Sequence, residues 1–378
     1  MKFESICVQT GHDGIQNGQV SLVSDLLDEQ YKEPEKKLAA TDFDQTLTRD
    51  DIGALAFMES FLQKRFWDFS IKEFEELLAP TKPIPPNLLS YRDLVTKAAN
   101  GNIKASSEVQ KNSTRLLELF SSLKGLYGSL QKNPDNMVLQ EVFAKEMLEF
   151  DEIVLPLEVF FSDFFGNQIF SRTRFLVGKS NLDTKKLSQN ILKKGKVQLN
   201  DAVFSIFEEL KKRGGEQRIV TTNLKSIVRE IVKESVLGEV FSEDDVIATM
   251  LAKNGERRFE SGKRSVDFSQ YIEGEPVYGK RKVELLRQTS VNIDRRFNLA
   301  AGDSVGNDGP MMAESLKRDG IAIVVVPANT DIEKVAQSFE VKIQNELNKE
   351  SLTEEEKQRM WYLQSNQFTD ARELKCNH

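Results

Sequence analysis

The chain has 378 residues, enough for two or three domains, which excludes a single small module. Acidic residues outnumber basic ones by 59 to 52, and the net charge of −7 gives no reason to expect a nucleic-acid partner. The histidines and cysteines all lie near the ends, at Cys7, His12, Cys376 and His378. Any site between them works without imidazole or thiolate, which excludes histidine-assisted nucleophiles and His/Cys zinc centres from the body of the chain.

The two ends of the chain suggest its compartment. Two cysteines near opposite termini form no disulfide framework, and the N-terminal region contains no apolar run of the kind that a signal peptide needs. No stretch approaches the ~20 apolar residues that cross a bilayer. We therefore expect a cytoplasmic protein without a membrane span, and secretion by a route that needs no signal peptide stays open. A zinc site shared by the four rare residues would require the termini to meet, which nothing in their spacing demands.

The first half of the chain predicts one buried strand followed by helices. After an N-terminal extension over residues 1–37, a short apolar run at Leu38–Phe43 indicates a buried strand. In the region that follows, apolar residues recur at steps of three and four, as one face of a helix requires. One such set is Leu116, Leu119, Phe120 and Leu123. Breaks at Pro80–Pro86 and Gly125–Pro134 divide the region into several helices.

From Asn200 onward, strands alternate with helices. Four short apolar runs predict strands: Arg218–Thr222, Val246–Thr249, Asn298–Ala301 and Ile321–Val326. This alternation favours an α/β fold with a Rossmann-like, mainly parallel sheet. The first strand joins that sheet only if the helical region is an insertion. We therefore predict a core of residues 38–48 and 199–330, a large all-helical cap of residues 49–198 inserted after the first strand, and a C-terminal helical segment over residues 331–378.

Two aspartates follow the first strand directly, in the sequence Asp42-Phe43-Asp44. Residues two apart on a strand point to the same side, so both carboxylates are expected at the carboxyl end of the sheet, where open α/β sheets bind ligands. Two close, buried carboxylates repel each other unless they share a proton or meet a cation. The pair therefore suits a metal site with one nucleophile and one acid/base.

A second acidic pair, Asp303 and Asp308, lies in a Gly-Asp-Ser-Val-Gly-Asn-Asp sequence that starts at Gly302, directly after a predicted strand. Glycine lets the backbone approach a ligand closely, and the two acids supply further oxygen ligands. Four carboxylates at strand ends therefore predict a Mg²⁺ site.

Two further features supply groups for an anion. Thr222 and Asn223 end one predicted strand and open the next helix, where a hydroxyl beside helix-start amides binds a phosphate oxygen. Lys280 begins an amphipathic helix, and its ammonium can neutralise both a carboxylate nucleophile and a transferring phosphoryl group.

This order of elements resembles the haloacid dehalogenase superfamily, in particular its phosphatases of the phosphoserine and phosphocholine type, which carry a helical C1-type cap. The resemblance covers Leu38–Thr48 and about residues 200–327, and the helical region matches by its position as a cap. The family's four motifs are present in order.

The resemblance implies a role for each candidate residue. Asp42 would be the nucleophile and Asp44 the general acid/base, which would also offer its main-chain carbonyl to the metal. Thr222 and Asn223 would bind the substrate phosphate, and Lys280 would stabilise the developing charge. The residues implied to hold Mg²⁺ are Asp42, Asp44, Asp303 and Asp308.

Two of these assignments have alternatives. The phosphate-binding hydroxyl is either Thr221 or Thr222, and Thr222 fits the strand–loop–helix pattern of the family better. The lysine is either Lys280 or Lys282, and we favour Lys280 because that choice keeps the apolar residues of the helix on its inner face.

On this resemblance we expect a Mg²⁺-dependent phosphomonoester hydrolase that works through an aspartyl-phosphate. Its substrate would be a small phosphorylated metabolite of the phosphoserine, phosphocholine or phosphoethanolamine type. The alternative is a bacterial effector-like protein that uses the same fold on a macromolecular phospho-substrate or as a partner-binding surface.

Overall fold

The computed structural model describes residues 7–10, 20–22, 27, 37–60, 106–165, 184–195, 197–250, 277–289, 297–327 and 330–364. The chain divides into two compact units. The first consists of Met1–Ile52, Ser188–Met250 and Glu275–His378, and the second of Gly53–Leu187 and Leu251–Gly274.

The first unit has an α/β fold built on one eight-stranded sheet, with the order β2-β1-β8-β7-β6-β3-β4-β5. Its strands are β1 (Cys7–Thr10), β2 (Val20–Leu22), β3 (Leu38–Thr41), β4 (Glu216–Leu224), β5 (Val246–Thr249), β6 (Phe297–Gly302), β7 (Ile321–Val326) and β8 (Met360–Gln364). The six strands from β8 to β5 are parallel to their neighbours, and β1 and β2 form an antiparallel pair at the β8 edge.

The sequence explains why the central strands are parallel and covered on both faces. All residues of β3, β5, β6 and β7 are buried, and each strand is a continuous run of apolar and small residues without an exposed alternate position. The mainly parallel sheet predicted from the sequence is therefore confirmed, with strand bounds that differ from the predicted ones by at most two residues.

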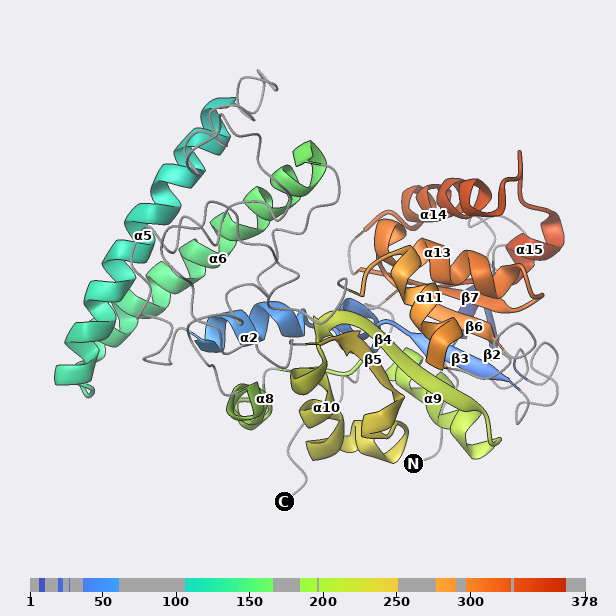
Figure 1. Ribbon diagram of the computed structural model, residues 1–378, viewed down its shortest axis with the longest axis horizontal. Coiled ribbons are helices and arrows are strands. Elements are labelled where there is room, and N and C mark those ends of the chain that lie inside the picture. The colour runs from blue at the N-terminus through green and yellow to red at the C-terminus, as the bar shows by residue number, and fades with distance from the viewer. Residues whose placement is uncertain are drawn as a thin grey trace. The chain divides into compact units, whose positions relative to one another are not determined.

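Helices cover both faces of this sheet. The helices of the first unit are α9 (Asp201–Lys212), α10 (Lys225–Glu234), α11 (Lys280–Thr289), α13 (Val305–Leu316), α14 (Ile332–Leu347) and α15 (Glu354–Gln358). Figure 1 shows α9 and α10 on one face, and α11, α13 and α14 on the other. The connections after β3 and β4 run toward β5, whereas those after β6 and β7 run toward β8, so the strand order reverses between β3 and β6. Ligands of open α/β sheets bind at such a switch point.

The end of the chain differs from the expectation of a separate helical segment. Helices α14 and α15 are present, but Met360–Gln364 then forms β8, which pairs in parallel with β7 along Ala322–Val326. Trp361 and Leu363 are buried there as part of the core. Residues 360–364 are therefore an integral part of the sheet. The predicted N-terminal extension likewise contributes β1 and β2 to it.

The described part of the second unit is helical. It contains α2 (Ile52–Ser60) from Gly53 onward, α5 (Ser106–Lys132) and α6 (Met137–Phe165). Helices α5 and α6 pack against each other, and Arg115 on α5 pairs with Glu149 on α6 at 2.6 Å. The predicted inner face of α5 is buried at Leu116, Leu119, Phe120 and Leu123. A short helix, α8 (Thr184–Lys193), leads from this unit into the first.

One predicted break in the helical region is narrower than expected. Helix α5 continues through Gly125 and Gly128, and the chain leaves helical conformation only between Lys132 and Met137. The other predicted break, Pro80–Pro86, lies outside the described residues. None of the helices in the described ranges is long and apolar enough to cross a membrane.

Candidate functional site

The candidate site lies where β3 and β6 end side by side at the point of reversed strand order. Asp42 directly follows β3, and its backbone N–H donates a hydrogen bond of 2.9 Å to the carbonyl of Ala301 on β6. Asp303 directly follows β6. The parallel pairing of the two strands therefore brings together two acidic segments that lie more than 250 residues apart.

Three carboxylates and one ammonium form the centre of this site. Oxygen atoms of Asp42, Asp303 and Asp308 all lie within 4.8 Å of one another. The buried Lys282 donates from Nζ to Oδ1 of Asp42 and to Oδ1 of Asp308, both at 2.6 Å. Lys282 and Asp308 are fully buried, and Asp42 is 4% exposed. One ammonium cannot neutralise three carboxylates, so the set retains negative charge that a divalent cation would offset.

Asp308 is held by the backbone of its own loop. Its Oδ2 accepts hydrogen bonds from the backbone N–H groups of Asp303, at 3.2 Å, and Ser304, at 3.0 Å, while its Oδ1 accepts from Lys282. Both oxygens are therefore already engaged by the protein. Asp308 fixes the position of Lys282 and of the Asp303 loop, in addition to its contribution to the negative charge.

This packing requires a glycine at position 302. A Cβ atom there would lie 2.4 Å from Cβ of Asp308, well inside van der Waals contact. We expect Gly302→Ala to displace the Asp308 loop and to lower the free energy of unfolding by about 1–3 kcal/mol. Gly125→Ala in α5 is the matched control, because a Cβ there meets no atom within 4 Å. It should stabilise the protein by roughly 0.5–1 kcal/mol. Urea denaturation measures both, and equal effects of the two substitutions would contradict the close approach at Gly302.

Asp44 lies in the turn Phe43–Leu47 that follows Asp42, where its own backbone is extended, with φ −70° and ψ 135°, and Gln45 adopts a φ of 55°. The side chain of Asp44 accepts two hydrogen bonds. Oδ1 accepts from the backbone N–H of Ile52 at 2.8 Å, and Oδ2 accepts from Nδ2 of Asn223 at 2.6 Å. Thr46 in the same turn donates its hydroxyl to Oδ1 of Asp303 at 3.0 Å. The turn therefore connects both acidic segments and the end of β4.

Three carboxyl groups of the site, those of Asp42, Asp44 and Asp303, have raised pKa values. Burial raises the pKa of Asp42 from 3.8 to about 7; Lys282 opposes this shift, and Asp308 adds to it. Burial and the neighbouring charges of Asp51 and Asp42 hold the pKa of Asp44 well above its usual range. Burial and the charges of Asp308 and Asp42 do the same for the pKa of Asp303.

Lys282, in contrast to the carboxyl groups, is held in its charged form. Burial lowers the pKa of Lys282, but the charges and hydrogen bonds of Asp308 and Asp42 outweigh it, so the net shift is upward. Lys282 therefore stays protonated between its two carboxylates. An oxygen-rich, incompletely neutralised set of this kind fits a hard cation such as Mg²⁺.

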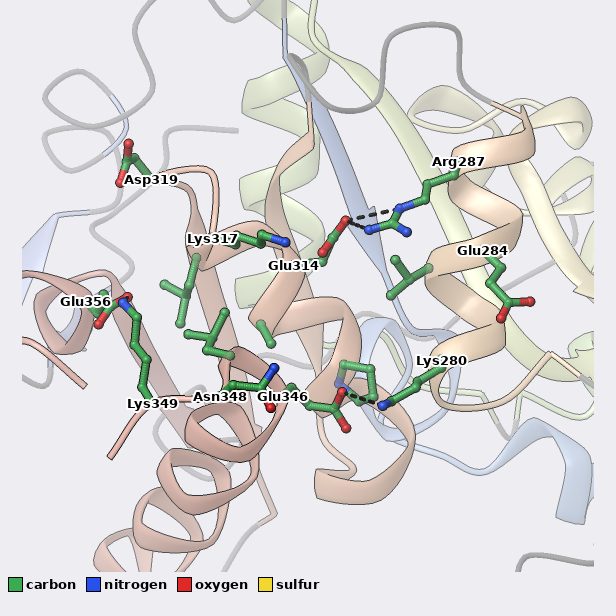
Figure 2. Close-up of a pocket in the computed structure, with 15 residues that line it drawn as sticks. Lys280, Glu284, Arg287, Glu314, Lys317, Asp319, Glu346, Asn348, Lys349 and Glu356 are labelled. Atoms are coloured by element: carbon green, nitrogen blue, oxygen red, sulfur yellow. Dashed lines mark hydrogen bonds and ion pairs between the residues drawn. The ribbon is translucent and has the colours of Figure 1, made fainter. Parts of the chain in front are cut away.

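The structure corrects the choice of Lys280. The side chain of Lys280 is 75% exposed and pairs with Glu346 at 3.2 Å, so it does not contact the carboxylate cluster. Lys280 and Glu346 line a different cavity of about 510 Å³ between α11, α13 and α14 (Figure 2). Lys282, two residues later, is on the inner face of α11 beside Leu286, which follows one turn after it.

The other side chains predicted to bind an anion, those of Thr221, Thr222 and Asn223, form hydrogen bonds within the protein. The Thr222 hydroxyl donates to the carbonyl of Val277 at 3.0 Å, and Nδ2 of Asn307 approaches it at 3.5 Å. The Thr221 hydroxyl accepts from the backbone N–H of Asn223 at 3.2 Å. The choice between the two threonines therefore stays a prediction. The side chain of Asn223, predicted to bind phosphate, is instead bonded to Asp44.

Thr46 is a site residue to which the sequence interpretation gave no role. Its position in the sequence could have indicated a role in the site, because Thr46 lies in the acidic segment that begins at Asp42. The missing information was the long-range contact, since only the pairing of β3 with β6 brings Thr46 to Asp303.

Comparisons with known proteins do not assign this chain to a class. No family model matches it, and no curated protein matches it. Among solved structures it is similar to a conserved functionally unknown protein from Anaerococcus prevotii DSM 20548. The sequence identity is 16% and the TM-score 0.48, over 80% of this chain and 83% of that chain. A similarity at this level supports no functional assignment.

Proposed function

We propose that the chain is a Mg²⁺-dependent phosphomonoester hydrolase that acts through an aspartyl-phosphate on Asp42. The observation that supports this most is the cluster of Asp42, Asp303, Asp308 and Lys282 at the switch point of a parallel sheet, with Asp44 two residues from Asp42. Paired carboxylates with raised pKa values suit a nucleophile beside an acid/base.

In the first half-reaction, an ionised Asp42 oxygen bonds to the substrate phosphorus as the bond from phosphorus to the leaving oxygen breaks. Asp44 gives its proton to that leaving oxygen, so an alcohol departs and Asp44 is left ionised. In the second half-reaction, Asp44 takes a proton from a water molecule whose oxygen attacks the same phosphorus. The bond to Asp42 breaks, and free phosphate and the Asp42 carboxylate are restored.

The remaining residues keep these groups in place and balance their charge. Lys282 favours the ionised form of Asp42 through its contact at 2.6 Å, and Asp308 holds Lys282 in position. Thr46 orients Asp303. Asp42 and Asp303, with Asp308 behind them, would hold the metal ion, which when bound supplies positive charge to the phosphate oxygens.

We also propose that the second unit is a cap that selects the substrate. Its larger part, Gly53–Leu187, is inserted between the turn after β3 and the helices that lead to β4, so it follows directly on the segment that carries Asp42 and Asp44. The residues of the carboxylate cluster, together with Asp44 and Lys282, would contact only the phosphoryl group of a substrate. Selection among phosphoserine, phosphocholine and phosphoethanolamine, the substrate class implied by the family resemblance, therefore needs residues outside the core.

The test is phosphate release from 4-nitrophenyl phosphate with Mg²⁺, with excess chelator, and with Asp44→Asn. We expect activity only with Mg²⁺, and a fall of about 10²–10⁴-fold in phosphate release for Asp44→Asn, because Asp44 also activates the water of the second half-reaction, which every substrate requires. Activity that is the same with chelator as with Mg²⁺ would contradict the proposal.

The raised carboxylate pKa values also predict how Mg²⁺ affects stability. Asp42 ionises near pH 3.8 in the unfolded chain but near pH 7 in the folded protein, so between these values the folded state holds more protons. The stability of the metal-free protein should therefore fall as the pH rises through this window. Because Mg²⁺ replaces the protons, the rise in melting temperature on adding it should be small at pH 5 and large at pH 8. A rise that is independent of pH would contradict this account.

A further inference from the structure

The general acid/base of the proposed reaction has an unusual orienting partner. Two donors from different elements hold the Asp44 carboxylate, namely the backbone N–H of Ile52 at the start of α2 and the side-chain amide of Asn223 on β4. Asn223 lies 179 residues from Asp44 in the sequence and is 5% exposed. The contact is therefore a long-range product of the fold, between a buried amide and a partly exposed carboxylate.

The polar groups next to the Asn223 amide have partners of their own. Its backbone N–H is bonded to the Thr221 hydroxyl, and the side chain of Thr222 bonds to Val277. The amide nitrogen reaches Oδ2 of Asp44 at 2.6 Å, a short hydrogen bond for a neutral donor. The hydrogen bond of the Asn223 side chain therefore goes to the Asp44 carboxylate.

A neutral amide suits this position because Asp44 must alternate between two protonation states. A lysine in its place would fix Asp44 as a carboxylate, and an aspartate would add a further negative charge beside Asp42, Asp51 and Asp303, which already act on Asp44. Asparagine fixes the rotation of the carboxylate without adding net charge. The two donors take one site on each oxygen, and each oxygen keeps a second site for a proton or a substrate.

We propose that Asn223 is a positioning residue that aims the Asp44 carboxyl group at the leaving-group oxygen. This inference rests on the proposed phosphomonoester hydrolysis. It concerns the first half-reaction, in which the proton of Asp44 moves to the leaving oxygen as the bond from phosphorus to Asp42 forms. Loss of the amide should leave phosphate binding and nucleophilic attack intact and should impair the proton transfers of Asp44. Of these, only delivery of the proton to the leaving oxygen affects kcat/KM, because the aspartyl-phosphate has already formed when water attacks.

The test compares two substrates that differ in their need for that proton. 4-Nitrophenolate leaves readily without protonation, whereas phenolate, a stronger base, depends on it. For Asn223→Ala, we expect kcat/KM to fall about 30-fold on phenyl phosphate and less than about threefold on 4-nitrophenyl phosphate, with KM unchanged on both. Asn223→Ser, which keeps a short donor, should recover part of the loss on phenyl phosphate.

Gln217→Ala is the matched control. Gln217 is a buried amide on the same strand, 4% exposed, whose Nε2 donates to the carbonyl of Phe207 at 2.5 Å, and it has no contact with the site. It should lower the melting temperature as much as Asn223→Ala does, but it should reduce kcat/KM on both substrates equally or not at all.

Three outcomes would overturn the positioning role of Asn223. They are an equal loss on both substrates, a rise in KM on both, as expected for a phosphate-binding residue, or a difference between substrates that Gln217→Ala reproduces. The failure of the parent proposal would be seen separately, as an absence of Mg²⁺-dependent hydrolysis of either substrate by the wild-type protein.

Discussion

Asp42→Asn is expected to abolish phosphate release, with kcat lower by at least about 10³-fold, because an amide cannot form the aspartyl-phosphate. The fold should survive the change. An asparagine oxygen still accepts from Lys282, and the substitution removes one of three carboxylates that lie within 4.8 Å of one another. We therefore expect a melting temperature in chelator equal to or above that of the wild-type protein, together with a smaller increase on adding Mg²⁺.

Glu314→Gln provides the matched control for Asp42→Asn. Glu314 is also a largely buried acid of the first unit, 8% exposed, and pairs with Arg287 and Arg318 away from the carboxylate cluster. It lines the cavity shown in Figure 2. Glu314→Gln should lower the melting temperature, because it weakens these ion pairs, but should leave kcat as in the wild-type protein. Equal activity of Asp42→Asn and Glu314→Gln would exclude Asp42 as the nucleophile.

The second large effect is expected for Lys282→Ala. This substitution removes the ammonium that lies 2.6 Å from both Asp42 and Asp308, so two buried carboxylates lose their charged partner. Breaking a buried ion pair in this way typically costs about 3–5 kcal/mol of stability. We expect a loss of this size in urea denaturation at pH 8 in chelator, and a smaller loss at pH 5, where a proton neutralises Asp42.

Lys280→Ala is the control for Lys282→Ala, because Lys280 lies outside the carboxylate cluster. Lys280 is largely exposed, and exposed ion pairs such as Lys280–Glu346 contribute only about 0–1 kcal/mol. We expect almost no change in stability and full activity. A larger effect of Lys280→Ala than of Lys282→Ala on either quantity would contradict the position of the buried lysine described above.

The sequence allowed most of the sheet and its acidic cluster to be predicted, because both depend on local patterns. Continuous apolar runs mark parallel strands that are buried on both faces, and an acid that follows such a strand has to lie at its carboxyl end. For this reason Asp42 and Asp303 were placed at the same edge of the sheet before the strand pairing was known. The pairing of β3 with β6 then brings them together.

The lysine was misplaced because the apolar pattern of a helix defines a broad inner face. The prediction of Lys280 keeps Val283 and Leu286 on the inner face of the helix, and both are indeed buried. Position 282, however, lies one turn before Leu286 and shares its side of the helix, whereas position 280 lies one turn before the exposed Glu284. A helical projection of the predicted helix would have favoured Lys282.

Strand β8 and the partner of Asn223 could not be predicted for a different reason. The run Met360–Leu363 is short and follows a strongly charged segment, and its strand conformation is fixed by pairing with β7 and by burial of Trp361. The contact of Asn223 with Asp44 likewise depends on the conformation of the turn at Gln45. Both features arise from tertiary packing that no local pattern specifies.

The central claim is that Asp42 forms a covalent bond to phosphorus, and trapping that bond tests it most directly. The wild-type protein would be mixed with 4-nitrophenyl phosphate and Mg²⁺, quenched in acid within the first turnovers, digested and mapped by mass spectrometry. We predict a phosphoryl group on the peptide that contains Asp42, and none on the same peptide from Asp42→Asn. Full turnover without a phosphorylated peptide, or a phosphoryl group on another residue, would contradict the account.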